Sequence, residues 1–266
     1  MATHLSINEN IYGHKKRLDW IKHDLTKRQR VLEFGCGTGY MLTFQLLLEG
    51  YDAYGVDLDD QSIAYGKEIF GSSGLDSERL INSDIRGLAG NFDVIIASEV
   101  FEHISNQDLG LIIELIKKKI VGCGTLIVTV PNGYGWFELE SFIWFKLGIG
   151  RLFDWLQLTR TLLYLKRKIL GSYIDAAYPS TLSSSPHVQR FTFSSIKWLL
   201  KKYGFEILKT EGTVFFAGPI SNLFFTGIGP LMNANKYLGS KFPRFASGFM
   251  LVCRENKCET SDSQTI

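Results

Sequence analysis

The alternation of short apolar runs with longer amphipathic segments is the feature that most constrains how this chain folds. The run at 92–98 (FDVIIAS) is apolar on both of its faces, which is typical of a parallel strand covered by helices on both sides. Strands that alternate with helices in this way predict a doubly wound α/β sheet. The predicted strands are 31–34, 51–57, 79–84, 92–98 and 124–131, and the predicted helices between them are 40–49, 60–70 and 108–121.

The alternation stops after Pro131. Residues 133–170 hold long apolar stretches interrupted by basic residues, and a turn-rich segment (YPSTLSSSP) follows at 178–186. We interpret this region as a helical insertion after the fifth strand. The sheet is then predicted to resume with a helix at 191–204 and strands at 205–212 and 246–254.

The length of 266 residues suits one large domain with an insertion, and such a chain buries enough surface to fold without a disulfide or a metal. A hydrophobic share of 45% excludes a disordered chain, and a net charge of +2 argues against a general nucleic-acid binder. The predicted division is an N-terminal helical segment at 1–28, an α/β domain made of 29–132 and 187–255, a helical insertion or lid at 133–186, and a disordered tail at 256–266.

Four scattered cysteines form neither a C-x-x-C pair nor a zinc-binding spacing. The start of the sequence has no secretory pattern, so we expect reduced thiols in a cytoplasmic protein. These cysteines are Cys36, Cys123, Cys253 and Cys258.

A glycine-rich turn follows the first predicted strand. Glycines at 35, 37 and 39 let the backbone approach a ligand and leave helix N–H groups pointing at it. A dinucleotide-binding loop would have glycine where this chain has Tyr40. Glu33, two residues before the first glycine, suits a cationic ligand better than a pyrophosphate.

Two acids follow the next two predicted strands. Asp57 ends the second strand, where a carboxylate can accept hydrogen bonds from both hydroxyls of a ribose. Asp84 follows the third strand and is placed to bond an adenine amino group. The turn and the two acids together predict a nucleoside-binding site.

The pattern E-x-G-x-G-x-G, Asp57, Ser83-Asp84 and FDVIIASEVFEHI resembles the class I S-adenosylmethionine-dependent methyltransferases, strongly over 30–131 and more loosely over 187–253. The resemblance implies a Rossmann-like seven-stranded sheet whose last strand is antiparallel. It also implies that Glu33 and the glycines hold the methionine end of the cofactor, Asp57 the ribose, and Asp84 with Ile85 the adenine. The cofactor-binding residues expected on this basis are Glu33, Gly35, Cys36, Gly37, Gly39, Asp57, Leu58, Asp84 and Ile85.

An E-x-x-E-H grouping follows the fourth predicted strand. If a helical turn begins near Glu99, then Glu102 and His103 lie on its same face. The grouping, with a later histidine that His187 matches here, resembles the ubiquinone-biosynthesis O-methyltransferases and the small-RNA 2′-O-methyltransferases. That resemblance implies a magnesium-type ion held by Glu99, Glu102, His103 and His187.

A cation at this point would lower the pKa of an acceptor hydroxyl and hold a neighbouring hydroxyl, so we expect an acceptor with vicinal hydroxyls. Without a metal, His103 or His187 could act as the general base. In that case Glu99 could contact only the amino end of the cofactor, and Glu102 could cap a helix. The catalytic residues we expect are His103, His187 and Glu99, with Tyr12 and His14 as weaker candidates.

The insertion carries six basic residues against the single acid Asp154 between 146 and 168. Its apolar residues can share one helical face, which allows two interpretations. The helix could be a lid over the acceptor, the interpretation we favour because amphipathic helices usually pack on their own domain. It could also make peripheral membrane contact through 140–170, beside a lipid-linked acceptor at the inner face of the membrane. The residues of that face are Leu152, Trp155, Leu156, Leu163 and Leu170.

The uncharged stretch from Thr213 to Asn235 contains glycines, prolines and amides, so we expect it to connect the last two strands and line the site rather than span a bilayer. The function expected is S-adenosylmethionine-dependent O-methylation of a hydroxylated small-molecule or lipid-linked acceptor, with quinone-like and sugar acceptors included. The alternatives are a metal-free N- or C-methyltransferase and a non-catalytic cofactor-binding protein. An RNA acceptor is disfavoured by the near-neutral charge.

Overall fold

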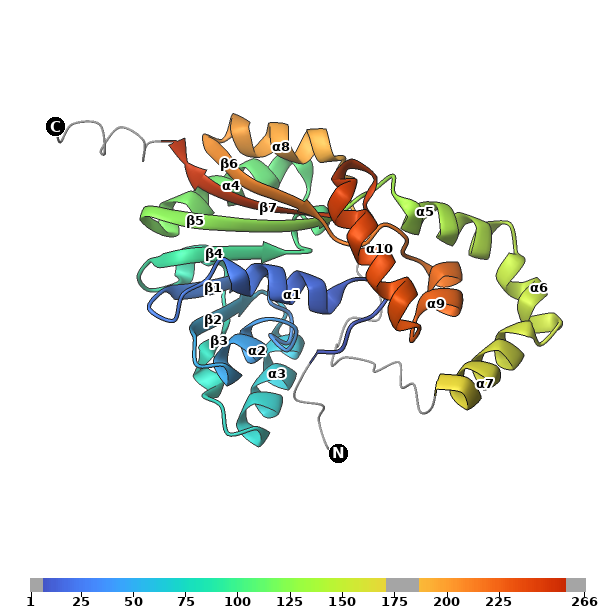
Figure 1. The fold of residues 1–266 in the computed structure, drawn as a ribbon. Coiled ribbons are helices and arrows are strands. Elements are labelled where there is room, and N and C mark those ends of the chain that lie inside the picture. Colours follow the sequence, from blue (N-terminus) through green and yellow to red (C-terminus); the bar gives the residue numbers. More distant parts are fainter. Residues whose placement is uncertain (1–6, 171–186, 257–266) are drawn as a thin grey trace.

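The computed structural model describes residues 7–170 and 187–256. Its centre is a seven-stranded sheet with strand order β3-β2-β1-β4-β5-β7-β6 (Figure 1). The strands are β1 (Arg30–Phe34), β2 (Asp52–Asp57), β3 (Leu80–Asn82), β4 (Phe92–Ser98), β5 (Ile120–Pro131), β6 (Phe205–Gly212) and β7 (Gly248–Glu255).

The first five strands are parallel, whereas β7 pairs antiparallel with both β5 and β6. This arrangement confirms the predicted doubly wound sheet with its antiparallel last strand. Because the carboxyl ends of parallel strands meet at one edge, the turns after β1, β2 and β4 lie together there. The glycine turn, Asp57 and Glu99 all come from these turns.

Helices cover both faces of the sheet. Side chains of α1 and α2 pack with inward residues of β1, β4 and β7 on one face, whereas α4 and α8 pack on the other face. The flanking helices are α1 (His14–His23), α2 (Thr43–Leu48), α3 (Asp60–Ser72), α4 (Asn106–Lys119) and α8 (Phe193–Lys202). Two-sided coverage explains why β4 is apolar on both faces.

The insertion forms a chain of short helices rather than one long helix. They are α5 (Trp136–Ser141), η4 (Phe142–Lys146), α6 (Ile149–Trp155) and α7 (Leu158–Leu170). The single helical face predicted from Leu152 to Leu170 is wrong, because Gln157 has a φ of 55° and ends the helical run between α6 and α7. The side chain of Leu170 and the turn-rich segment lie outside the described residues.

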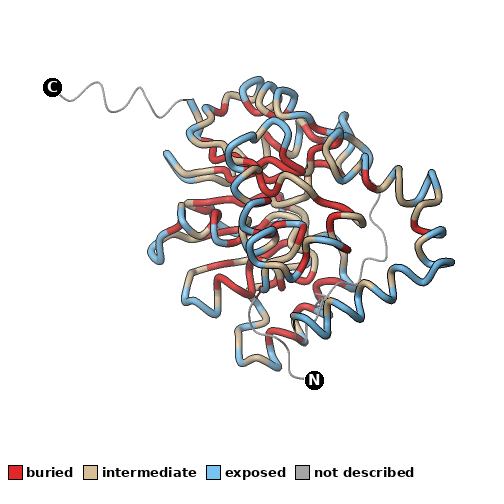
Figure 2. The backbone as a smooth tube through the Cα atoms, turned by 45° about the vertical axis from the view of Figure 1, so that its right-hand side comes forward, coloured by how far each residue is buried: buried red, intermediate tan, exposed pale blue. Residues whose placement is uncertain are grey.

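The same insertion projects from the body of the molecule and turns back beside α9 (Pro219–Phe225), which α7 contacts (Figure 1). Most of this projecting backbone is exposed (Figure 2). The helices α9 and α10 (Gly229–Lys241) connect β6 to β7, as predicted for the uncharged stretch. None of the described helices is long and apolar enough to cross a membrane.

Two of the cysteines, Cys36 and Cys253, are free thiols. Cys123 is disulfide-bonded, so the prediction that all the cysteines are reduced is wrong at this residue. Cys123 therefore does not support the expectation of a cytoplasmic protein, which rested on reduced thiols. The predicted disordered tail lies outside the described residues beyond Asn256.

Candidate functional site

The glycine turn after β1 depends on three residues in the left-handed region. Gly35, Gly37 and Gly39 have φ angles of 71°, 54° and 69°, which residues with a Cβ rarely adopt. A Cβ on Gly35 would lie 2.6 Å from a methyl carbon of Val100, whereas one on Gly37 would meet nothing within 4 Å. Gly37 therefore borders open space, as a residue that approaches a ligand must.

A cavity of about 210 Å³ lies between this turn and α1, and we call it the cofactor cavity. It brings together Glu33 and the first part of the predicted glycine loop. The helix α1 and the end of β4 supply most of the remaining wall. The lining residues are His14, Arg17, Leu18, Ile21, Glu33, Gly35, Cys36, Gly37, Met41, Leu42, Ser98 and Glu99.

Glu33 is a buried acid on the wall of the cofactor cavity. Its carboxylate accepts hydrogen bonds from the backbone N–H of Thr43 at 2.9 Å and from the hydroxyl of the same residue. Burial nevertheless raises the pKa of Glu33 to about 7. A cationic group entering the cavity would favour the ionised carboxylate, which suits the amino group of a methionine.

Asp57 holds the turn from the neighbouring strand. Its carboxylate accepts from the N–H of Gly37 at 2.7 Å and from the N–H of Asp59 at 2.9 Å. These bonds fix the carboxylate next to the glycine that borders open space. A ribose bound there would find an acceptor oriented by the backbone.

Asp57 and the other predicted cofactor residues that follow it in the chain are not among the residues that line this cavity. The carboxylate of Asp84 accepts from the guanidinium of Arg86 at 2.7 Å, and this bond lowers the pKa of Asp84. The side chain of Ile85 is buried in the core, and Leu58 is exposed. A Cβ on Gly39 would meet Leu80, away from the cavity.

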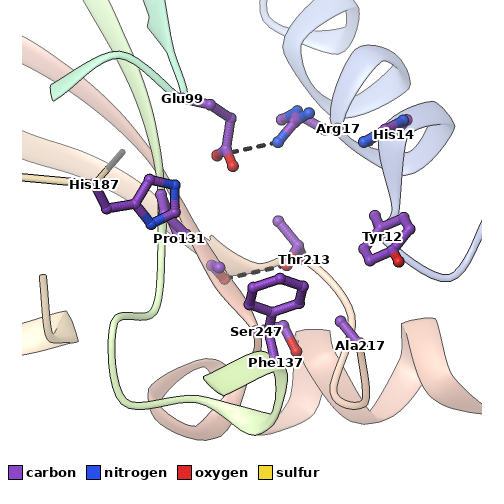
Figure 3. Close-up of a pocket in the computed structure, with 11 residues that line it drawn as sticks. Tyr12, His14, Arg17, Glu99, Pro131, Phe137, His187, Thr213, Ala217 and Ser247 are labelled. Carbon is purple, nitrogen blue, oxygen red and sulfur yellow. Dashed lines mark hydrogen bonds and ion pairs between the residues drawn. The ribbon is translucent and has the colours of Figure 1, made fainter. Parts of the chain in front are cut away.

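A second cavity of about 180 Å³ adjoins the first, and we call it the acceptor cavity (Figure 3). The two cavities share His14, Arg17 and Glu99 on their walls. A group held in one cavity would therefore lie close to a group held in the other. The acceptor cavity is lined by Tyr12, His14, Arg17, Glu99, Pro131, Phe137, His187, Thr213, Ala217, Ser247 and Gly248.

Arg17 is a residue of this junction that the sequence analysis missed. Its guanidinium lies 3.0 Å from the carboxylate of Glu99 (Figure 3). The same carboxylate also accepts a hydrogen bond from the Thr129 hydroxyl at 3.0 Å. Arg17 lies one helical turn after His14, and that spacing was the only available signal among many basic residues near the start of the chain. Burial and the charge of Arg17 lower the pKa of His14 to about 3, so this imidazole is neutral.

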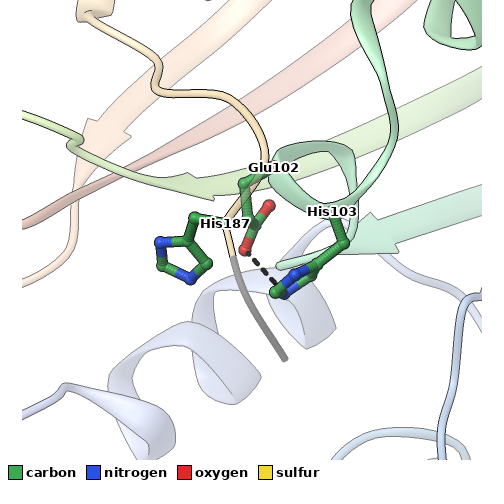
Figure 4. A group of neighbouring side chains, drawn as sticks. All are labelled: Glu102, His103 and His187. Carbon is green, nitrogen blue, oxygen red and sulfur yellow. Dashed lines mark ion pairs between the residues drawn. The ribbon is translucent and has the colours of Figure 1, made fainter. Parts of the chain in front are cut away.

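Three of the predicted metal ligands converge beside the acceptor cavity (Figure 4). Ligand atoms of Glu102, His103 and His187 all lie within 4.8 Å of one another. Two backbone hydrogen bonds produce this meeting, because the N–H groups of Val188 and Gln189 donate to the carbonyl of Glu102. His187 belongs both to this group and to the wall of the acceptor cavity.

Glu99 is not part of this group. Its φ of 57° is left-handed, and the short helix η3 begins only at Phe101, so the helical turn predicted from Glu99 does not form. The Glu99 carboxylate instead pairs with Arg17, at the junction of the two cavities. The structure thus separates the four predicted ligands into three that converge and one that faces α1.

Glu102 is only 1% exposed, and its Oε2 has no hydrogen-bond partner. Burial and the nearby charge of Glu99 raise the pKa of Glu102 well above its usual value. The other carboxylate oxygen lies 3.8 Å from Nε2 of His103, whose ring centroid is 5.1 Å from that of His187. An unsatisfied buried carboxylate oxygen beside two imidazoles fits the ligand preferences of a divalent cation.

Comparisons with known proteins find methyltransferases. The chain is 31% identical over 81 residues to the ribosomal protein L11 methyltransferase of Neisseria meningitidis, a match that covers 30% of this chain and 27% of that protein. A second match, to the protein of the same name from Paraburkholderia phymatum, is 24% identical over 117 residues and covers 42% of this chain and 35% of that protein. The chain thus matches only about a quarter to a third of the length of these curated relatives.

Solved structures share the fold over most of the chain. Magnesium protoporphyrin IX methyltransferase from Synechocystis, solved with bound SAH, has a TM-score of 0.52 at 15% identity, covering 91% of this chain and 81% of that chain. An S-adenosylmethionine-dependent methyltransferase from Clostridium acetobutylicum has a TM-score of 0.51 at 15% identity, covering 91% and 92%. A family model described as a methyltransferase domain matches residues 14–210, which include the glycine turn, Asp57 and the Glu102 group. The chain therefore belongs to the methyltransferase-domain family of class I S-adenosylmethionine-dependent methyltransferases.

Proposed function

We propose that this protein transfers the methyl group of S-adenosylmethionine to a hydroxyl of an acceptor bound in the acceptor cavity. The observation that carries the proposal is the junction of the two cavities at His14, Arg17 and Glu99. A sulfonium held in the cofactor cavity would face the acceptor across this junction. Methyl transfer is an in-line displacement, so the alignment of donor and acceptor supplies much of the catalysis.

Different residues of the chain bind different parts of the donor. Glu33 receives the cationic amino group, and the N–H groups of the glycine turn approach the donor where Gly37 borders open space. Asp57 lies beside that glycine and receives the ribose hydroxyls. The helix α1 closes the cavity on its other side through Arg17 and Leu18.

We further propose that Glu102, His103 and His187 hold a divalent cation next to the acceptor. The unsatisfied buried oxygen of Glu102 and the double position of His187, in the cluster and on the cavity wall, support this proposal. Such a cation would lower the pKa of the acceptor hydroxyl, which is the difficult step near neutral pH. The three side chains would orient an acceptor that offers vicinal hydroxyls.

The experiment has two stages. Calorimetry first measures whether the donor and its demethylated product bind. Turnover is then measured over a panel of catechols, hydroquinones and sugars, with EDTA treatment followed by Mg²⁺ or Mn²⁺ addition. We expect O-methylation that chelation abolishes and metal restores. His187→Ala should reduce turnover strongly, whereas His23→Ala, at an exposed histidine of α1, is the matched control.

A metal-free mechanism is the alternative, with His103 or His187 as general base. Undiminished turnover after rigorous chelation, together with loss of turnover in the His187 variant, would establish it. Methylation of nitrogen or carbon acceptors alone would contradict the hydroxyl acceptor. Donor binding without turnover over the whole panel would instead indicate a non-catalytic cofactor-binding protein.

A further inference from the structure

Residues 142–170, which we call the arm, expose an unusual amount of apolar surface. Phe145, Trp155 and Ile169 are 68%, 78% and 76% exposed, and Leu147 is 61% exposed. Side chains of this size are normally buried, and a contiguous exposed group of them marks an interaction surface. Figure 2 shows that this part of the backbone stands away from the buried core.

The arm is also strongly basic. Its single acid is Asp154, so its net charge is +5 although the whole chain carries only +2. The rest of the chain is therefore net negative, and the positive charge is concentrated where the apolar side chains are exposed. The six basic residues are Lys146, Arg151, Arg160, Lys166, Arg167 and Lys168.

The helix α7 separates these properties by face. Leu158, Leu165 and Ile169 follow the spacing of one helical face, and all are exposed. Arg160, Arg167 and Lys168 are also exposed, with Arg160 and Arg167 on the opposite side of the helix and Lys168 between the two sides. An apolar face opposed by a cationic face is the pattern of a helix that lies in the interface of an anionic membrane.

A third cavity, of about 430 Å³, lies behind α7 and faces α9. Its lining is mainly apolar, and Lys166 and Arg167 add two cations; the apolar members include Trp144, Phe145, Leu163 and Leu223. Tyr12 lines both this cavity and the acceptor cavity, so the two are adjacent. The cavity behind α7 thus lies between the arm and the neighbourhood of the acceptor cavity.

We propose that the arm docks the protein on an anionic phospholipid bilayer, and that the cavity behind α7 receives the apolar chain of an acceptor taken from that bilayer. The first half stands on the charge and exposure of the arm alone. The second half rests on the proposed methyl transfer, since it places the hydroxylated head of the acceptor in the acceptor cavity. The acceptor class is then an amphiphile with a hydroxylated head and an apolar chain.

Co-sedimentation with vesicles tests the docking. We expect binding to vesicles that contain phosphatidylglycerol, weak binding to pure phosphatidylcholine, and loss of binding as salt is raised. The triple variant Arg160→Gln, Arg167→Gln, Lys168→Gln should bind about a hundredfold more weakly, since each cation near an anionic surface contributes about fivefold. The matched control Lys118→Gln, Lys201→Gln, Lys202→Gln removes the same charge from exposed positions on α4 and α8 and should bind normally.

The apolar contribution is tested with Trp155→Ser. The control is the same substitution at another exposed tryptophan, Trp198→Ser on α8, whose side chain is 62% exposed. Only Trp155→Ser should weaken vesicle binding. Equal binding to both vesicle types, or equal effects of the two triple variants, would overturn the docking. So would dissociation of a dimer by Trp155→Ser without any vesicle binding, because the arm would then be a self-association surface.

The cavity is tested with Leu163→Trp, which adds bulk to its wall. The readout is kcat/KM for a long-chain catechol presented in vesicles against the same head group without its chain. We expect the variant to lose activity selectively on the long-chain acceptor. Equal loss on both would contradict a chain-binding role. Donor calorimetry, which needs neither vesicle nor acceptor, separately reports failure of the proposed function.

Discussion

Glu33 is a residue whose protonation should report cofactor binding. Burial raises its pKa from 4.5 to about 7, so the empty folded protein keeps a proton that the unfolded chain loses within this range. The stability of the empty protein therefore falls as pH rises from 4.5 toward 7. A cationic amino group beside Glu33 would lower the pKa again, so donor binding just below pH 7 should release a proton.

Calorimetry in two buffers of different ionisation enthalpy measures this release. Glu33→Gln should abolish it and flatten the pH dependence of stability in that range. Glu68→Gln, at an exposed acid of α3, should change neither. If proton release persisted in Glu33→Gln, a residue other than Glu33 would bind the amino group of the donor.

Glu102 gives a second prediction, on the cation site. Glutamine has the shape of the protonated carboxyl that burial and Glu99 favour. In the absence of metal, Glu102→Gln should therefore unfold at a temperature no lower than the unmodified protein. The increase in Tm on adding Mn²⁺, by contrast, should disappear, whereas the exposed control Glu206→Gln should keep it. An unchanged Mn²⁺ response in Glu102→Gln would exclude Glu102 as a ligand.

At the level of single residues, the sequence pattern predicted that Glu33 and the first glycines lie together, and the structure has them on the wall of one cavity, with Asp57 bonded to Gly37. Their positions follow from the ends of adjacent parallel strands, which periodicity reveals. Asp84 does not line the cavity, and its carboxylate is bonded to Arg86, a local contact that periodicity does not predict. Arg17 was also beyond this reasoning, because its ion pair with Glu99 spans segments far apart in the chain.

The turn between β1 and α2 strictly limits which residues it can hold. Gly35→Ala and Gly37→Ala each force an alanine into the left-handed region, at a cost of roughly 1–2 kcal/mol. Only the new methyl group at position 35 also meets Val100, at 2.6 Å. We expect Gly35→Ala to lower the free energy of unfolding by clearly more than Gly37→Ala does.

Denaturant unfolding of the two variants measures the difference. Adding Val100→Ala to Gly35→Ala should recover part of the loss, because it removes the methyl groups that obstruct the new Cβ. Equal losses at positions 35 and 37 would show that backbone conformation alone determines the requirement for glycine.

Regular elements were predictable where their pattern was local. The strand β4 has the predicted bounds 92–98, and β6 has the predicted bounds 205–212. The helix α2 begins at Thr43, later than predicted, because the glycine turn continues through Gly39, whose carbonyl accepts from Phe44. The break at Gln157 carries no glycine or proline, so amphipathic spacing alone wrongly joined α6 to α7.

At the scale of the whole molecule, ligand binding should stabilise the fold, because the walls of the cofactor cavity come from α1, β1 and β4 at once. A ligand at a hundred times its Kd adds about 2.7 kcal/mol to the free energy of unfolding. For a domain of this size, that corresponds to a rise in Tm of about 5–10 °C. Thermal unfolding with the demethylated product of the donor checks this expectation. A rise of the same size with adenosine alone would show that the methionine end adds nothing.

The strand order of the sheet could be expected only from the family resemblance, because pairing between strands leaves no local pattern in one sequence. The same holds for the meeting of His187 with Glu102 and His103. Backbone hydrogen bonds between η3 and residues 188–189 bring these side chains together. Neither segment has a sequence pattern that predicts contact with the other.

The position of β7 has a consequence for how the chain is made. This strand is synthesised after β5 and β6, yet it lies between them and is hydrogen-bonded to both. Until it is synthesised, the edges of β5 and β6 that β7 will occupy are unpaired. Unpaired edges of an apolar sheet can pair with strands of other chains. A stop codon shortly before residue 248 should therefore yield an aggregating product rather than a folded, shortened protein, and we expect the nascent chain to bind chaperones.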